Sequence, residues 1–115
     1  MKALMFAAVL TACAGPVLAC SCAPRPANGP GPELLVTAEV IRVDPATRPS
    51  GHVATLRVLA HHAGQSARTI RVETSRHTAA CGVAFQPGER RQYALYRRDG
   101  HYSTNACYMF HHAKR

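Results

Sequence analysis

Apolar and polar residues alternate along five short stretches of this chain. Strands are therefore predicted over residues 33–43, 52–60, 69–73, 91–97 and 102–109, because successive side chains of a β-strand point to opposite faces. In the first stretch, the apolar residues that share one face are Leu34, Val36, Ala38 and Val40. This face is expected to belong to the core of a small domain.

Residues that favour turns separate these stretches. Residues 44–51 (DPATRPSG), 64–67 and 86–88 are rich in proline, glycine or polar side chains. The strongest hairpin signal is Asp99-Gly100, because both residue types tolerate the positive φ that a two-residue turn requires. No long stretch has the period of an amphipathic helix. The pattern predicts one all-β domain without repeats, either a small five-stranded barrel or a sandwich.

The first 19 residues are typical of a secretory signal peptide. Lys2 provides a basic start, residues 3–14 are almost entirely apolar, and Val17-Leu18-Ala19 ends in the small residue that a signal peptidase requires. The apolar run is too short to span a bilayer, and no second one follows, so we expect no transmembrane segment. The sequence predicts a leader over residues 1–19, one domain over residues 20–115, and a secreted or periplasmic protein.

Removal of the leader would also remove Cys13 and leave an even number of cysteines, as expected in an oxidising compartment. Cys20 and Cys22 are separated by one residue, and the strained ring makes a bond between them unfavourable. Each therefore needs a distant partner, and the chain offers Cys81 and Cys107. Both possible pairings remain open at this point. Residues 24–32 are rich in proline and glycine and are expected to form an irregular arm.

The chain carries a formal net charge of +8 at pH 7, which admits attraction to acidic polysaccharide, lipopolysaccharide or nucleic acid. The basic residues are spread along the sequence, however, without a cluster interleaved with aromatic residues, and this favours an ordinary basic surface. The pairs His61-His62 and His111-His112 are expected as exposed residues of a loop and a tail, not as metal ligands. Because no nucleophile elbow or carboxylate pair stands out, we expect neither an enzyme nor a bound cofactor.

The start of the expected mature chain, Cys-Ser-Cys-Ala-Pro at residues 20–24, resembles the tissue inhibitors of metalloproteinases, whose mature chains open Cys-x-Cys-x-Pro. The resemblance covers residues 20–110, and further matches in order are the strand over 35–40, Ala80-Cys81-Gly82, Pro87-Gly88-Glu89 and Cys107. It implies a netrin-like domain, which is an OB-fold barrel of five strands, with the disulfides Cys20–Cys81 and Cys22–Cys107. The family's third disulfide, its C-terminal helix, the short helix after its N-terminal arm and its second domain are expected to be missing, as in a minimal, bacterial-type module.

The resemblance also implies a function. In the family, the α-amino nitrogen and the carbonyl oxygen of the first cysteine chelate the zinc of a target metalloprotease. Carried over to this sequence, Cys20 would be the zinc ligand and Ser21 would enter the specificity pocket. Cys22, Ala23 and Pro24 would lie along the cleft like a peptide. The chemistry requires an unmodified amine on Cys20, because the neutral amine binds the open coordination position of a catalytic zinc.

An alternative interpretation removes that amine. Ala19-Cys20 could be a lipoprotein processing site, with Cys20 acylated and lipidated, and residues 10–13 (LTAC) offer a second such site at Cys13. The protein would then be an envelope-anchored module of the same fold. Such a module, lipid-anchored or secreted, would bind a polyanion or a protein partner through surface arginines such as Arg57 and Arg71. The oligomeric state expected under either interpretation is a monomer.

Overall fold

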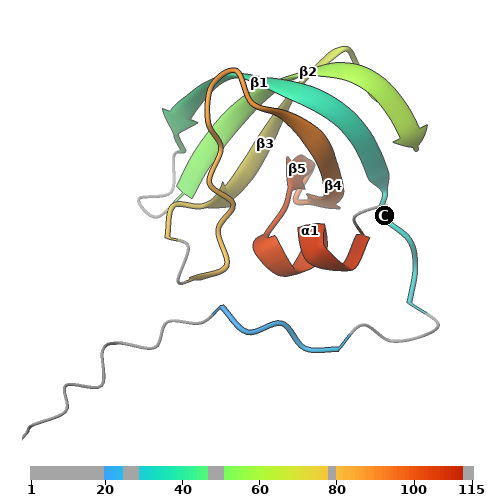
Figure 1. The fold of residues 1–115 in the computed structure, drawn as a ribbon, viewed down its shortest axis with the longest axis vertical. Helices are drawn as coiled ribbons and strands as arrows, with labels where there is room; N and C mark the ends of the chain where they lie inside the picture. The colour runs from blue at the N-terminus through green and yellow to red at the C-terminus, as the bar shows by residue number, and fades with distance from the viewer. Residues whose placement is uncertain (1–19, 25–28, 47–50, 78–79, 113–115) are drawn as a thin grey trace, which may run out of the picture.

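A single β-sheet of five strands makes up most of the structure (Figure 1). The computed structural model describes residues 20–24, 29–46, 51–77 and 80–112, so the predicted leader over residues 1–19 lies outside the described part. The elements in chain order are β1 (Leu34–Pro45), β2 (Gly51–Ala63), β3 (Thr69–Ser75), β4 (Arg90–Arg98), β5 (His101–Ser103) and α1 (Ala106–His112). Within the described ranges, no helix is long and apolar enough to cross a membrane.

The strand pairings close the sheet into a ring. β1, β2 and β3 are antiparallel neighbours, and β4 returns by a long connection to pair with β1. This spatial order of β4, β1, β2 and β3 is a Greek key. β5 then pairs antiparallel with β4 and parallel with β3, so that every strand has two neighbours. Register shifts along β1, such as the one between Val40 and Arg42, bend the long first hairpin around the ring.

The core lies inside this ring. The face predicted from alternation in β1 is buried, as are the facing residues of β2 to β4. The most deeply buried large side chains are Leu34, Val36, Val40, Leu56, Val72, Tyr93 and Leu95. The Tyr93 phenol reaches out of the core to the Glu89 carboxylate at 3.4 Å, and burial, reinforced by that carboxylate, raises the pKa of the phenol. Tyr93 is therefore a neutral hydrogen-bond donor at neutral pH.

The strand expected over residues 102–109 is wrong beyond Ser103. The chain leaves the sheet at Thr104, whose hydroxyl donates to the Ala94 carbonyl at 2.8 Å, and α1 then begins at Ala106. Asn105 caps this helix, because its Oδ1 accepts a hydrogen bond from the Tyr108 N–H at 2.8 Å. The expectation that a C-terminal helix is missing is therefore also wrong. α1 packs against β4 through Met109, which is buried in the core (Figure 1).

The two histidine pairs also lie in regular structure, in contrast to the prediction of a loop and a tail. β2 extends to Ala63 because it continues to pair with β1. His61 and His62 are exposed near the C-terminal end of this strand. Their side chains diverge as neighbours in a strand do: His61 contacts Ser66 at 2.8 Å and His62 contacts Thr37 at 2.7 Å. The second pair forms the last turn of α1.

The connection from β3 to β4 passes close to the end of β3 at Gly82. The Gly82 N–H donates to the His77 carbonyl at 3.0 Å, and a Cβ on Gly82 would collide with the carbonyl oxygen of Ser75. Only glycine fits here without a backbone shift, so the sequence Cys81-Gly82 fixes how the loop returns after the cysteine.

We expect Gly82→Ala to destabilise the domain by about 1–3 kcal/mol, because the added methyl group must displace the backbone of Ser75. In a domain of this size, that loss lowers Tm by several degrees. Gly31→Ala is the matched control, since a Cβ on Gly31 meets no atom within 4 Å. Thermal unfolding followed by circular dichroism would test both variants, and equal Tm values would contradict the close packing of Gly82.

Candidate functional site

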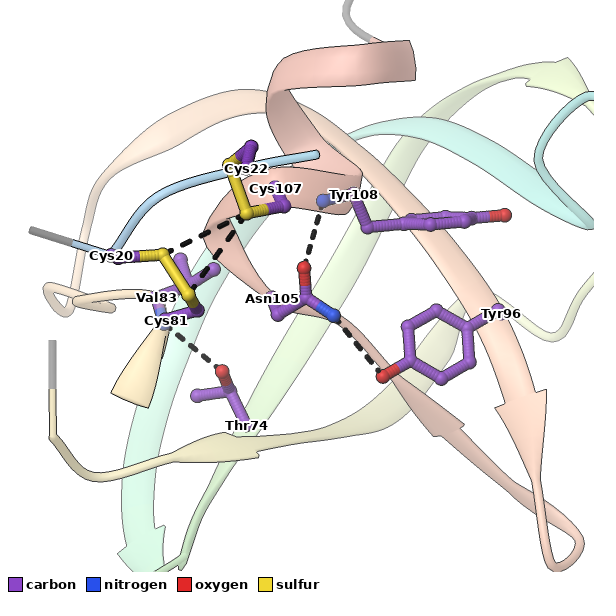
Figure 2. The surroundings of a disulfide bond; sticks show 9 residues. All are labelled: Cys20, Cys22, Thr74, Cys81, Val83, Tyr96, Asn105, Cys107 and Tyr108. Carbon is purple, nitrogen blue, oxygen red and sulfur yellow. Dashed lines mark hydrogen bonds between the residues drawn. A yellow bond between two sulfur atoms is a disulfide. The ribbon is translucent and has the colours of Figure 1, made fainter. Parts of the chain in front are cut away.

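Two disulfide bonds fasten the N-terminal segment to the domain (Figure 2). The bonds are Cys20–Cys81 and Cys22–Cys107, with sequence separations of 61 and 85 residues. This is the pairing that the family resemblance implies, and not the alternative that the cysteine spacing alone leaves open. The first bond fixes the segment to the β3–β4 connection and the second fixes it to α1.

The two disulfides pack against each other (Figure 2). The Sγ atom of Cys107 lies 3.7 Å from that of Cys20 and 3.9 Å from that of Cys81. A cluster of cysteines at this spacing resembles a metal site, but metals bind thiolates, and sulfur atoms joined in disulfides are not thiolates. With both bonds formed, the cluster is a structural cross-link between three segments of the chain.

Hydrogen bonds position the loop that carries Cys81. The Thr74 hydroxyl, buried on β3, accepts from the Val83 N–H at 3.0 Å, and the Cys81 carbonyl accepts from the Ala106 N–H at 2.7 Å. Cys81 itself has a φ of 63°, a conformation that a residue with a side chain adopts only when its surroundings hold it there. The loop is thereby connected to both β3 and α1.

The cap of α1 positions Cys107 in the first helical turn. Asn105 accepts the Tyr108 N–H through Oδ1 and donates from Nδ2 to the Tyr96 hydroxyl at 3.4 Å (Figure 2). The rings of Tyr96 and Tyr108 pack edge to face with centroids 4.9 Å apart. One side chain thus joins the helix start to β4, and the helix start holds one half of the Cys22–Cys107 bond.

The five residues singled out from the sequence lie together at the surface. Cys20 is half-buried, whereas Ser21, Cys22, Ala23 and Pro24 are exposed along a segment that runs beside α1 (Figure 1). The segment has a third attachment that sequence reasoning missed, because His111 was expected in a tail. The Nε2 atom of His111 contacts the Ala23 carbonyl oxygen at 2.9 Å.

An apolar hollow of about 460 Å³ adjoins the disulfide cluster. Its lining includes Gly82 and Ala106, which are the chain neighbours of Cys81 and Cys107. Met109 lines its floor, and Phe110 stands at its edge with 66% of its surface exposed. Aromatic residues are enriched in the cores of protein–protein interfaces.

No family model matches the chain, and no curated protein matches it. The likeness to the metalloproteinase inhibitors therefore rests on the residues quoted above.

We expect Asn105→Ala to cost about 1 kcal/mol, because the Tyr108 N–H at the helix start loses its partner. The Tm of the domain should fall by about 4–8 °C, and reductants should open the Cys22–Cys107 bond faster because the first turn frays. Asn105→Asp is the control, since it retains the oxygen that accepts the hydrogen bond. Peptide mapping of alkylated cysteines after brief reduction measures the second effect. If the alanine and aspartate variants behaved alike, Asn105 would not act as the cap.

Proposed function

We propose that this protein is a secreted inhibitor of zinc metalloproteases that acts through the amine and carbonyl groups of Cys20. The observation that carries the proposal is the exposed Cys-x-Cys-x-Pro segment, which two disulfides and the His111 contact hold against the domain. A segment held at three points loses little conformational entropy when it enters a cleft, and preorganisation of this kind increases affinity.

The proposed chemistry needs only the first residue of the mature chain. A catalytic zinc retains one coordination position for water, and a bidentate ligand with nitrogen and oxygen donors displaces that water. An α-amino group has a pKa near 8, so the metal binds its neutral form at small cost near neutral pH. The Cys20–Cys81 bond fixes the residue that carries both donor atoms.

The neighbouring residues would make the remaining contacts. Ser21 is exposed between the two cross-linked cysteines, and we propose that its side chain enters the specificity pocket of the protease. Cys22, Ala23 and Pro24 would occupy the cleft as an extended peptide. The hollow edged by Phe110 lies beside the same cluster and would enlarge the contact beyond the segment itself.

We further propose that the ring of strands is a netrin-like barrel of the OB type, formed by residues 20–115 after removal of the leader over residues 1–19, and that it acts as a monomer. The Greek-key order of the first four strands and the closure by β5 support this proposal. So does α1, because the family's inhibitory domain also ends in a helix.

One added residue tests the chelation directly. A chain with an alanine before Cys20 should have an inhibition constant for a zinc metalloprotease at least about 100-fold higher than the chain that begins at Cys20. This increase corresponds to a loss of about 2.8 kcal/mol of binding free energy. The extension converts the amine into an amide, which is a poor zinc ligand. The two proteins should have the same Tm and the same disulfides. Undiminished inhibition by the extended chain would contradict chelation through Cys20.

The intact mass of the protein purified from its native host tests the state of the amine. We expect a chain that begins at unmodified Cys20 and gains four hydrogens on reduction, because two disulfides open. A mass increased by acyl and diacylglycerol groups, or a chain that begins at Cys13, would exclude chelation. The protein would then be an envelope-anchored binding module.

A further inference from the structure

A polar groove lies along β3. It consists of two adjoining hollows of about 260 and 240 Å³, which share Ala46 and Glu73 in their lining. Each hollow alone is smaller than the usual small-ligand site of about 300–1,000 Å³, so a ligand of that size would have to span both. We call it the β3 groove, and its side chains with hydrogen-bonding or charged groups include Arg71, Glu73, Ser75, Tyr96, Arg98 and His101.

The strand register brings the basic residues of the groove together. β3 and β5 run parallel, with Val72 opposite Tyr102, so Arg71 and His101 each lie one residue before this pair. On the other side of β5, His101 is opposite Arg98 of β4. Arg71 and His101 line one of the two hollows and Arg98 lines the other, and all three residues are exposed. Among the described lining residues, the two arginines outnumber the one carboxylate, Glu73.

The groove arginines differ from four other arginines of the sheet, Arg42, Arg57, Arg90 and Arg91, each of which contacts a carboxylate. Arg57 and Arg90 both contact the Glu39 carboxylate, and Arg42 forms an ion pair with Asp44 at 2.9 Å. Among the residues that the structure describes, neither Arg71 nor Arg98 forms an ion pair with a carboxylate. Their guanidinium groups can therefore bind an external anion without first breaking a pair.

The other groups of the groove favour a carbohydrate. Ser75 and Tyr96 contribute hydroxyl groups that each accept one hydrogen bond within the protein and can still donate their own proton to a sugar hydroxyl. A single-stranded nucleic acid needs aromatic faces on which its bases stack. Among the described residues that line the groove, Tyr96 is the one tyrosine, phenylalanine or tryptophan, and its ring already packs against Tyr108.

We propose that the β3 groove binds an acidic oligosaccharide, with Arg71 and Arg98 on its carboxylate or sulfate groups. Guanidinium groups bind both anions through paired N–H donors. This site is separate from Cys20, and the proposal does not depend on protease inhibition.

Calorimetry with defined hexasaccharides tests the proposal in the absence of any protease. The probes are a heparin hexasaccharide, an oligogalacturonate that carries carboxylates without sulfates, a neutral hexasaccharide and a single-stranded oligonucleotide. At least one of the two acidic probes should bind, and the neutral hexasaccharide should not. The acidic probe that binds more tightly shows whether the groove prefers sulfate or carboxylate groups. Arg71→Gln and Arg98→Gln should each weaken binding of that probe by about tenfold, because each removes a charge-assisted contact.

Two variants control for net charge. Arg57→Gln and Arg68→Gln remove the same charge from exposed arginines outside the groove, and each should change Kd less than twofold. Equal losses in all four variants would show binding to the general basic surface and would overturn the site. Failure of both acidic probes to bind, or tighter binding of a single-stranded oligonucleotide, would overturn the proposal as well. Equal Tm values for all variants would show that the differences are not due to unfolding.

Discussion

The contact between the two disulfides connects parts of the chain that the sheet does not. Through it, the N-terminal segment, the β3–β4 connection and α1 meet at one cluster of sulfur atoms. In the chain-entropy model, each bond removes about 4 kcal/mol of unfolded-state entropy, and because the two loops overlap, the contributions are not additive. A domain of this size buries a modest core, so these bonds are a large part of its stability. They also hold the residue proposed to bind zinc.

Much of the fold was accessible from the sequence because strand alternation is a local signal. The buried face of β1 and the turn at Asp99-Gly100, where both residues have positive φ, followed directly from residue types. The helix α1 did not, because seven residues are too few to reveal a helical period. Its formation depends on Asn105 as a cap and on Met109 reaching the core. The first is a weak local signal, and the second is a tertiary contact that no local pattern contains.

The sequence also predicted only some features of the candidate site. The spacing of Cys20 and Cys22 predicted that each has a distant partner, but the choice between Cys81 and Cys107 depends on the path of the chain in space. The contact of His111 with the N-terminal segment also depends on that path, since it requires α1 to lie beside residues 20–24. The β3 groove was hidden for a similar reason. Arg71 and His101 become neighbours only through the parallel pairing of β3 and β5.

The two proposed sites share structural supports. Asn105 lines the β3 groove, contacts Tyr96 there, and caps the helix turn that carries Cys107. Ala80 lines the same groove and directly precedes Cys81, the partner of Cys20. A ligand that orders these residues in the groove would thus also order the attachments of the N-terminal segment. If such a ligand strengthened protease binding, linkage requires the protease to strengthen binding of the ligand by the same factor. Acidic oligosaccharide and protease would then act as mutually reinforcing ligands of one small domain.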